Sequence, residues 1–183
     1  YYDRYYGKDK WKSLMIISLA IGQGELGTTP IQMANYTAAI ANRGYYYIPH
    51  VVRSIGQQDG SPVSLYTEKK YTGISPENVE FVIEGMARAV NGGAGATARG
   101  AALDSIVICG KTGTAQNPHG PPHSIFVAFA PRVNPKIAIA VYVENAGAGA
   151  TYAAPVASLM IEKYLTRKIK RRDMETYIMN LKP

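Results

Sequence analysis

The sequence predicts an α+β protein in which an antiparallel β-sheet is covered by helices on both faces. Three apolar runs in its second half are rich in β-branched residues and do not alternate with polar ones, which is typical of strands buried on both faces; they are 106–109, 125–130 and 137–143. The short link "PRVNPK" joins the second run to the third, so these two strands are expected to form an antiparallel pair. Segments with helical spacing of apolar residues precede and follow the three runs.

The first predicted helix covers residues 30–42. Thr29 and Gln32 form a capping box, in which the threonine oxygen and the glutamine amide satisfy free backbone groups, and Pro30 occupies the first helical position. Gly44 is expected to supply the left-handed residue that ends this helix.

A small hairpin and two more helices complete the prediction. The β-rich segment 45–55, the turn "QQDGSP" and a short strand at 63–66 predict the hairpin. Ser75 and Pro76 then start a helix that stops at "NGG", and its core stripe comprises Val79, Val82, Ile83, Met86, Ala87 and Val90. A closing helix that lies on the sheet is predicted from the spacing of Ala153, Val156, Ala157, Met160, Ile161 and Tyr164. No internal repeat, long linker or second domain is evident.

Composition excludes several classes of protein. With 183 residues, of which 46% are hydrophobic and 18% charged, the chain is long enough for one domain with a hydrophobic core. Its longest apolar stretches span about eight residues, roughly half of what a bilayer crossing requires. The run 14–21 lacks the cleavage pattern of a signal peptide. Because the chain begins at Tyr1, we expect any membrane anchor to lie upstream.

The net charge of +7 suggests a nucleic-acid partner, but the arrangement of the basic residues does not. They gather at the two ends, in "RYYGKDKWK" and "RKIKRR", and the middle of the chain is nearly neutral. The sequence contains no zinc finger and no ribonucleoprotein motif, so we expect no nucleic-acid binding. The run 167–172 fits a solvated basic helix end, and contact with a partner or with lipid headgroups is the alternative.

Metal and thiol chemistry are not expected. The single cysteine, Cys109, excludes an intrachain disulfide and any site with several cysteine ligands, and its place in an apolar run indicates a buried small residue. His119 and His123 are four residues apart, but the two prolines between them prevent the helix that would align both rings on a metal. We therefore predict no metal and no cofactor.

The segment "CGKTGTAQNPHG" at 109–120 offers two functions for Lys111, phosphate binding and carboxylate binding. A P-loop requires a glycine where this chain has Ser105, and a helix where it has several prolines and glycines. Two other glycine-rich segments depart from the dinucleotide-binding fingerprint: "GGAGATARG" is predicted to be a flexible loop and "NAGAGATY" a tight strand-to-helix turn. Phosphate binding is therefore disfavoured.

Carboxylate binding agrees better with the residues around the lysine. On a strand, Lys111 would supply positive charge, Thr112 and Thr114 would donate hydrogen bonds to a carboxylate, and Gly113 would leave room for a peptide-like substrate to pair with the strand. The triplet Lys-Thr-Gly is short enough to occur by chance, so the interpretation depends on its context.

That context resembles a known family. Four segments follow one another in the family's order: "SLAIGQGELGTTPIQMANYTAAIANRG", "CGKTGTAQ", "HSIFVAFAP" and "AAPVASLMIEKYL". They are similar to the transpeptidase domain of class B penicillin-binding proteins, of the penicillin-binding protein 2 type, which implies the penicillin-binding and serine β-lactamase-like fold. Of the motifs Ser-x-x-Lys, Ser-x-Asn and Lys-Ser/Thr-Gly, only the last is present. We therefore expect residues 1–183 to be the C-terminal portion of one transpeptidase domain, with the nucleophile before Tyr1.

The resemblance implies acyl transfer on peptidoglycan stem peptides by a serine that β-lactams also acylate. Lys111, Thr112, Gly113 and Thr114 would form the wall of that site, and the Thr114 backbone amide would complete an oxyanion hole. Gln116 and His119, just past the strand, are candidates for the border of the acceptor site, with plain solvation as the alternative. The glycines of "GQG" at 22–24 would shape a loop near the site or serve packing alone.

The same resemblance places the parent protein in the bacterial cell envelope, on the periplasmic face of the cytoplasmic membrane. Its contact with the membrane would then depend on an N-terminal anchor outside this chain. The implied partners are stem peptides, β-lactam antibiotics and a cell-wall glycosyltransferase. The competing hypothesis is a noncatalytic binding or scaffold module of the same fold, in which the Lys-Thr-Gly strand carries no chemistry.

Overall fold

A three-stranded antiparallel sheet forms the centre of the computed structural model, which describes residues 1–52 and 66–181. Its middle strand is β4, and the strands in chain order are β3 (Cys109–Ala115), β4 (His123–Ala130) and β5 (Ile137–Val143). The strands predicted at 125–130 and 137–143, and their antiparallel pairing, are confirmed.

The first predicted strand, at 106–109, was wrong except for its last residue. Strand β3 starts at Cys109, and Ile106 makes only an isolated bridge with Leu103. Ile108 is nevertheless fully buried, because it packs into the core beside the sheet. Burial by packing and burial by strand pairing leave the same apolar pattern in a sequence, so the run alone did not distinguish them.

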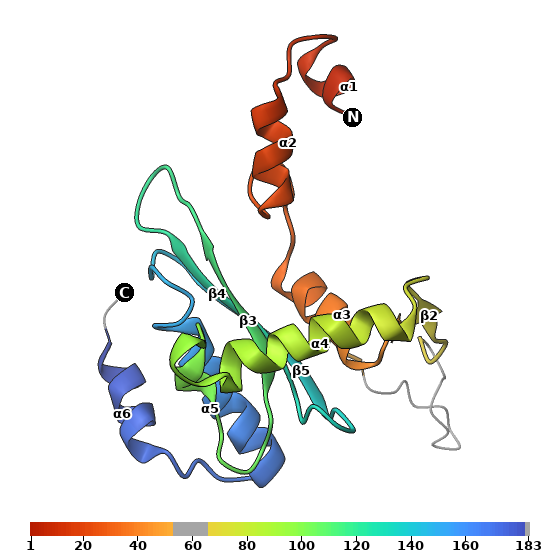
Figure 1. Ribbon diagram of the computed structural model, residues 1–183. Helices are drawn as coiled ribbons and strands as arrows, with labels where there is room; N and C mark the ends of the chain where they lie inside the picture. Colours follow the sequence, from red (N-terminus) through yellow and green to blue (C-terminus); the bar gives the residue numbers. More distant parts are fainter. Residues whose placement is uncertain (53–65, 182–183) are drawn as a thin grey trace.

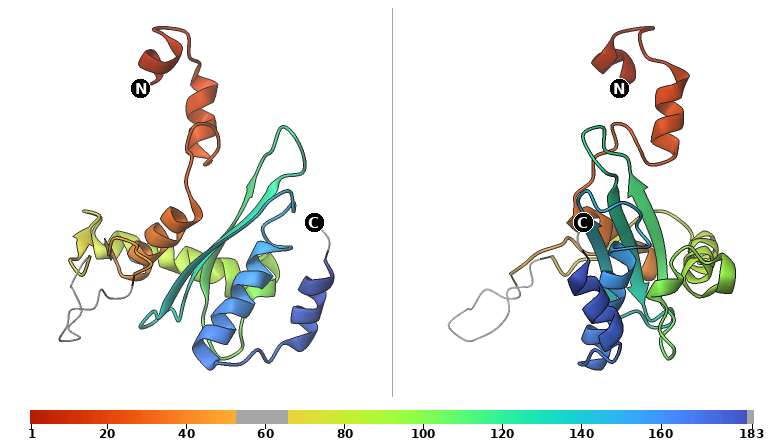
Figure 2. Two further views of the ribbon diagram at one scale, coloured as in Figure 1. Left: turned by 180° about the vertical axis from the view of Figure 1, so that it is seen from behind. Right: turned by 90° about the vertical axis from the view of Figure 1, so that its left-hand side faces the viewer.

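Helices cover both faces of the sheet, as predicted. On one face lies α5 (Ala153–Thr166), and on the other lie α3 (Pro30–Ala41) and α4 (Pro76–Asn91). Figures 1 and 2 show this arrangement from three sides. Strand β4 is buried along most of its length, whereas β5 is mostly half-buried and exposes Tyr142. Continuous burial on both faces therefore holds for the middle strand only.

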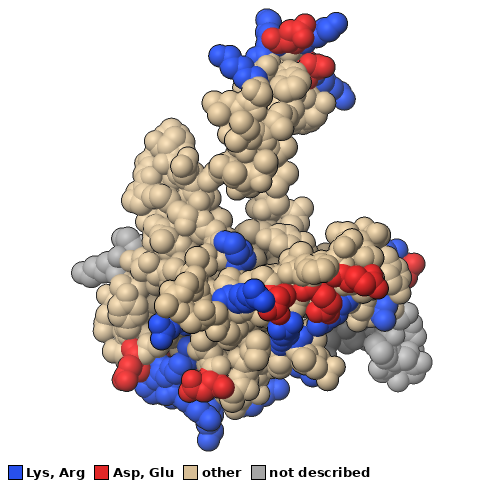
Figure 3. All heavy atoms as spheres, viewed as in Figure 1, with Lys and Arg blue, Asp and Glu red and all other residues tan. Residues whose placement is uncertain are grey.

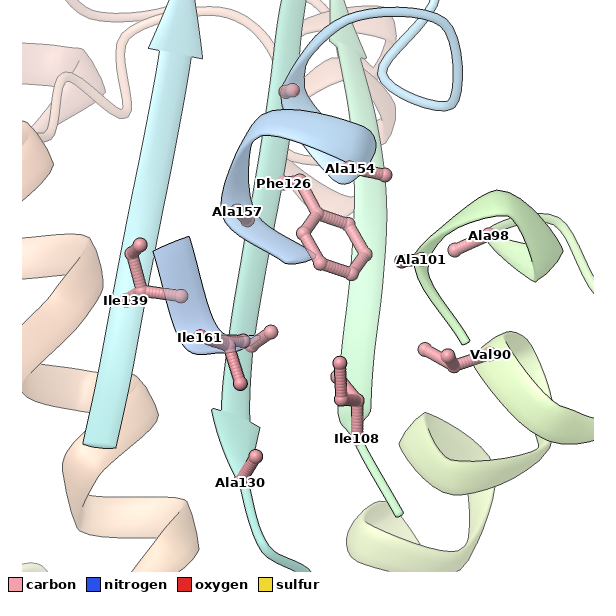
Figure 4. Packing of buried hydrophobic residues seen from close by; sticks show 12 residues of the cluster. Val90, Ala98, Ala101, Ile108, Phe126, Ala130, Ile139, Ala154, Ala157 and Ile161 are labelled. Carbon is pink, nitrogen blue, oxygen red and sulfur yellow. The ribbon is translucent and has the colours of Figure 1, made fainter. Parts of the chain in front are cut away.

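The main core cluster is built around Phe126 of β4 (Figure 4). Its ring is fully buried beside Ile108, and small residues of α5 and of the 90–101 region surround it. A Cβ atom on Gly110 would lie 2.3 Å from Cζ of Phe126. The large ring therefore requires glycine at the position beside it on β3. A second cluster joins α4 to the opposite face through Ile83, Cys109 and Phe129.

Helix α3 begins at Pro30, after a capping box formed by Thr29 and Gln32, as the sequence predicts. Gln32 Oε1 accepts from the Thr29 backbone N–H at 2.8 Å, and Thr29 Oγ1 accepts from the Gln32 N–H at 3.4 Å. The end of the helix differs from the prediction, because the residue in the left-handed helical region is Arg43, with φ +60°. Gly44 follows with φ +110° and donates its N–H to the Ala39 carbonyl at 2.8 Å. Both residues thus complete the helix end.

The hairpin predicted from 45–55 and 63–66 is not confirmed: residues 53–55 and its turn lie outside the described residues, and the strands that pair are different ones. Strand β1 (Tyr45–Tyr46) pairs with β2 (Lys70–Tyr71) in a two-stranded antiparallel sheet. Of the expected strand at 63–66, residues 63–65 lie outside the described residues, and Tyr66 lies in a turn.

Helix α4 and its apolar stripe agree with the prediction except at one position. Five of the six stripe residues are buried, but Val82 is 48% exposed. The outer side of α4 carries ion pairs, since Glu84 contacts both Arg88 and Arg132, and Figure 3 shows a row of acidic side chains along this helix with basic side chains beside it.

The segment that follows α4 was predicted to be a flexible loop, and it is a mostly exposed connection between α4 and β3. It contains two short 3₁₀ helices, η1 (Gly93–Gly95) and η2 (Arg99–Ala101). Ala98 and Ala101 are fully buried in the main core cluster. Their small side chains fit against Phe126, which glycine-rich composition alone does not indicate.

The basic side chains of the run 167–172 are exposed at and beyond the end of α5, as predicted for a solvated helix end, except that of Arg171. The run connects α5 to α6 (Arg172–Asn180), a helix that the sequence analysis missed. Arg171 pairs with the buried Glu162 at 3.1 Å and donates to Ser158 Oγ at 2.7 Å. A buried carboxylate needs a partner, so this arginine is drawn from the run into the protein.

Two further helices precede α3 and were not predicted. They are α1 (Tyr2–Tyr6) and α2 (Ser13–Ala20), which project away from the sheet and contain no buried residue. Among the described residues, no helix is long and apolar enough to cross a membrane.

Candidate functional site at the edge of strand β3

The predicted site residues lie on an edge strand. Strand β3 pairs with β4 on one side, and within the part of the chain that the structure describes its other side has no neighbouring strand. Because side chains alternate along a strand, Lys111 lies on the face covered by α3 and α4, and Thr112 and Thr114 lie on the face covered by α5. At this edge of the sheet, the ammonium of Lys111 therefore lies on one face and the hydroxyls of Thr112 and Thr114 lie on the other.

The backbone of Thr112 and Thr114 points toward the open edge. Lys111 Nζ donates to the Thr112 carbonyl at 2.9 Å, and Gln23 Nε2 donates to the Thr114 carbonyl at 3.4 Å. In an antiparallel ladder, the N–H and C=O groups of one residue point to the same side. The N–H groups of both threonines therefore face the open edge as well, where they can pair with an extended peptide or donate to an oxyanion.

Lys111 carries an exposed ammonium group that no carboxylate of the described residues neutralises. Among residues 1–52 and 66–181, no Asp or Glu oxygen lies within ion-pair distance of its Nζ. Its one hydrogen bond in the described structure goes to a backbone carbonyl. A lysine in this state can contribute its full charge to an anionic ligand at the strand edge.

Lys111 also lies at the border of an apolar groove of about 670 Å³ between α3, α4 and the sheet. Tyr36 and Ile40 of α3, Val82 and Met86 of α4, and Val127 of β4 line it. Partial burial raises the pKa of the Tyr36 phenol. This groove was not predicted, because the apolar stripe of α4 placed Val82 in the core. Helical spacing identifies the apolar residues of a helix, but it does not show which of them lie over open space.

Gln116 and His119 lie beyond the strand, in the loop between β3 and β4, and both are exposed. The His119 backbone N–H donates to Asn117 Oδ1 at 3.0 Å, and Asn117 Nδ2 donates to Asn145 Oδ1 at 2.8 Å. This loop is therefore tied to the loop after β5. The "GQG" segment also lies beside β3, as its Gln23 contact with Thr114 shows.

Two residues next to Thr114, Gly149 and Ser124, were not predicted to belong to the site. The Gly149 N–H donates to Thr114 Oγ1 at 3.5 Å, and the fully buried Ser124 donates to the carbonyl of Ala148, the residue before Gly149. Both contacts join residues more than 20 positions apart. The segment "NAGAGATY" was correctly predicted to be a turn between a strand and a helix. No residue pattern within the segment indicates that it lies over β3.

The cysteine at the start of β3 is not suited to nucleophilic chemistry. Cys109 is fully buried, and burial raises the pKa of its thiol to about 11. A thiol in this state is a poor nucleophile at neutral pH. In the described part of the chain, no group of three His, Cys, Asp or Glu side chains is arranged to hold a metal ion.

Comparison with known proteins gives a consistent family. The protein-family model described as "Penicillin binding protein transpeptidase domain" matches residues 4–162 of this chain. Peptidoglycan D,D-transpeptidase MrdA of Haemophilus influenzae is 32% identical over 181 residues, which cover 88% of this chain and 27% of that protein. Peptidoglycan D,D-transpeptidase PbpA of Mycolicibacterium smegmatis is 34% identical over 78% of this chain and 30% of its own. The chain thus spans less than a third of the length of these relatives.

Solved structures agree. Penicillin-binding protein 2 (PBP2) of Pseudomonas aeruginosa, in complex with WCK 5153, has a TM-score of 0.75 and 36% identity over 93% of this chain and 37% of that one. Penicillin-binding protein A of Mycobacterium tuberculosis, as an imipenem acyl-enzyme complex, has a TM-score of 0.69 and 33% identity over 80% of this chain and 33% of that one.

Proposed function

The chain belongs to the penicillin-binding protein transpeptidase family, and on this premise we propose that it forms the C-terminal portion of a peptidoglycan D,D-transpeptidase domain. In this proposal the complete protein cross-links stem peptides by serine acyl transfer and is acylated by β-lactams. The observation that carries the proposal is the exposed ammonium of Lys111 at the open edge of β3, a strand that also carries two threonine hydroxyls on its other face and two backbone amides directed to that edge.

The proposed binding step uses charge and edge pairing together. The carboxylate of a D-Ala-D-Ala terminus, or of a β-lactam, would accept hydrogen bonds from the hydroxyls of Thr112 and Thr114 in the positive field of Lys111. Gly113 would let the substrate backbone approach the strand. Gln116, with His119, would border the site where the acceptor amine enters.

The proposed chemical step breaks the amide bond between the two D-alanines. A serine from the preceding portion of the protein attacks the carbonyl carbon, and the carbonyl oxygen becomes an oxyanion that accepts from the Thr114 N–H. The serine proton passes to the nitrogen of the terminal D-alanine as the amide bond breaks, which leaves the acyl group on the serine. An amine of a neighbouring peptidoglycan strand then attacks this ester, takes the acyl group and returns a proton to the serine oxygen. A β-lactam follows the first half of this path, but its leaving amine stays attached by the opened ring.

The apolar groove beside Lys111 has a place in the same proposal. It lies on the side of β3 where the ammonium is, and its lining belongs to α3, α4 and β4. We assign to it the portion of the domain that carries the nucleophile, since apolar surface of this kind is normally covered in a complete domain. The parent protein would act in the cell envelope, at the periplasmic face of the membrane, with a cell-wall glycosyltransferase as a further partner.

A fluorescent penicillin tests the proposed function. The full-length protein should form a covalent adduct that survives denaturing electrophoresis, and an excess of unlabelled penicillin should prevent it. The 183-residue chain should remain unlabelled at the same concentration, because it contains no Ser-x-x-Lys. Failure of the full-length protein to label would contradict the transpeptidase proposal, and labelling of the short chain would mean that the nucleophile is one of its own residues.

A further inference from the structure

The loop between β5 and α5 lies against the Lys-Thr-Gly strand, and its contacts converge on Thr114. We call residues 145–149 the clamp loop. Its last residue, Gly149, directs its N–H to Thr114 Oγ1 at 3.5 Å. A Cβ atom on Gly149 would lie 2.5 Å from the Gly113 carbonyl oxygen and 2.3 Å from that of Ile125. The loop backbone therefore lies directly on the sheet, where no larger residue fits.

Other contacts hold the clamp loop in this position. Ser124, fully buried on β4, donates to the Ala148 carbonyl at 2.9 Å and accepts from the Ala153 N–H at 3.1 Å. At the other end of the loop, the Gly147 N–H donates to the Pro122 carbonyl at 2.8 Å.

Asn145, the first residue of the clamp loop, fixes the tip of the β3–β4 hairpin. Its backbone N–H donates to Nδ1 of His123 at 3.1 Å, and its side-chain oxygen accepts from Asn117. With the contacts of Gly147 and Gly149, the clamp loop holds both the end of β3 and the loop that follows it.

From these contacts we infer that Gly149 is a positioning residue for the Thr114 hydroxyl, and that the clamp loop sets the preference of the site for a ligand carboxylate. A hydroxyl group has one proton to donate. Because the Thr114 oxygen accepts from Gly149 on the sheet face, its proton is directed to the open edge of β3, where a carboxylate can accept it. The inference rests on the proposed function and adds to it a residue outside the Lys-Thr-Gly motif.

The test compares two antibiotics that differ only in the group to be recognised, benzylpenicillin and its methyl ester. Acylation rates of the full-length protein with each give a carboxylate preference. Gly149→Ala should lower this preference about tenfold, as expected for loss of one hydrogen bond to a charged group. Gly100→Ala is the matched control: a Cβ atom there meets nothing within 4 Å, and the preference should not change. Equal slowing with both antibiotics would overturn the inference.

A double-mutant cycle separates positioning from general damage. Thr114→Val removes the hydroxyl, so adding Gly149→Ala to it should change the carboxylate preference less than about twofold. If the two effects multiply instead, Gly149 does not act through Thr114 and the inference is wrong. If Gly149→Ala does not fold, Ser124→Ala replaces it in both experiments, since it loosens the loop without a clash. For Ser124→Ala, the results that support or overturn the inference are the same as for Gly149→Ala.

The controls also distinguish this inference from the proposed function. A wild-type protein that neither antibiotic acylates contradicts the transpeptidase proposal itself. A wild-type protein that prefers the carboxylate form, together with a Gly149→Ala variant of unchanged preference, supports the proposed function and overturns the positioning role.

Discussion

Replacement of Lys111 by alanine should slow acylation of the full-length protein by penicillin about 100-fold to 1000-fold, the effect typical of removing one preorganised electrostatic group from a transition state. The ammonium is exposed, has no carboxylate partner in the described structure, and borders both the open strand edge and the apolar groove. Its loss removes positive charge from the place where the ligand carboxylate would bind and where the oxyanion would form. Stopped-flow measurement with a fluorescent penicillin gives the rate.

The same substitution should leave the fold intact, because replacing an exposed surface side chain usually changes stability by at most about 0.5 kcal/mol. Circular dichroism of Lys111→Ala should therefore match the wild-type spectrum. Lys163→Ala, at an exposed lysine on α5, is the matched control and should acylate at the wild-type rate. Unchanged acylation in Lys111→Ala would remove this lysine from the site.

Replacement of Phe126 by alanine should lower the free energy of unfolding by about 3–5 kcal/mol, the range measured for buried phenylalanines. The ring is fully buried at the centre of the main core cluster, where helix α5, strand β3 and the 90–101 region meet (Figure 4). Truncation leaves a cavity that Gly110, with no side chain, cannot fill. Urea unfolding of the 183-residue chain, followed by circular dichroism, measures the change.

A phenylalanine on the surface provides the comparison. Phe81 on α4 is 79% exposed, so Phe81→Ala should change the free energy of unfolding by less than about 0.5 kcal/mol. If Phe126→Ala cost no more than Phe81→Ala, the ring would not be the centre of the core, and the close fit between Phe126 and Gly110 would have no energetic meaning.

The elements predicted correctly are those with a local signal in the sequence. Helix α3 has a capping box, α4 starts at Ser75 and Pro76, and the two apolar strands are joined by a short turn. In each case the residues that decide the structure are neighbours in the chain. The Lys-Thr-Gly strand had such a signal too, although its start was misplaced.

The features that were missed depend on contacts between distant residues. Arg171 leaves the basic run because Glu162 is buried nine positions away, and two alanines of the segment after α4 are buried because they pack against Phe126. The contact of Gly149 with Thr114 spans 35 positions. A single sequence shows the glycine but not what it lies against, so the motif could be predicted and the residues that position it could not.

The most direct test is a crystal structure of the full-length protein acylated by a β-lactam. We predict that the antibiotic carboxylate lies about 3 Å from the hydroxyls of Thr112 and Thr114, near the Lys111 ammonium, and that the acyl carbonyl oxygen accepts from the Thr114 N–H. An adduct whose carboxylate lies away from the open edge of β3, with Lys111 turned from it, would contradict the account.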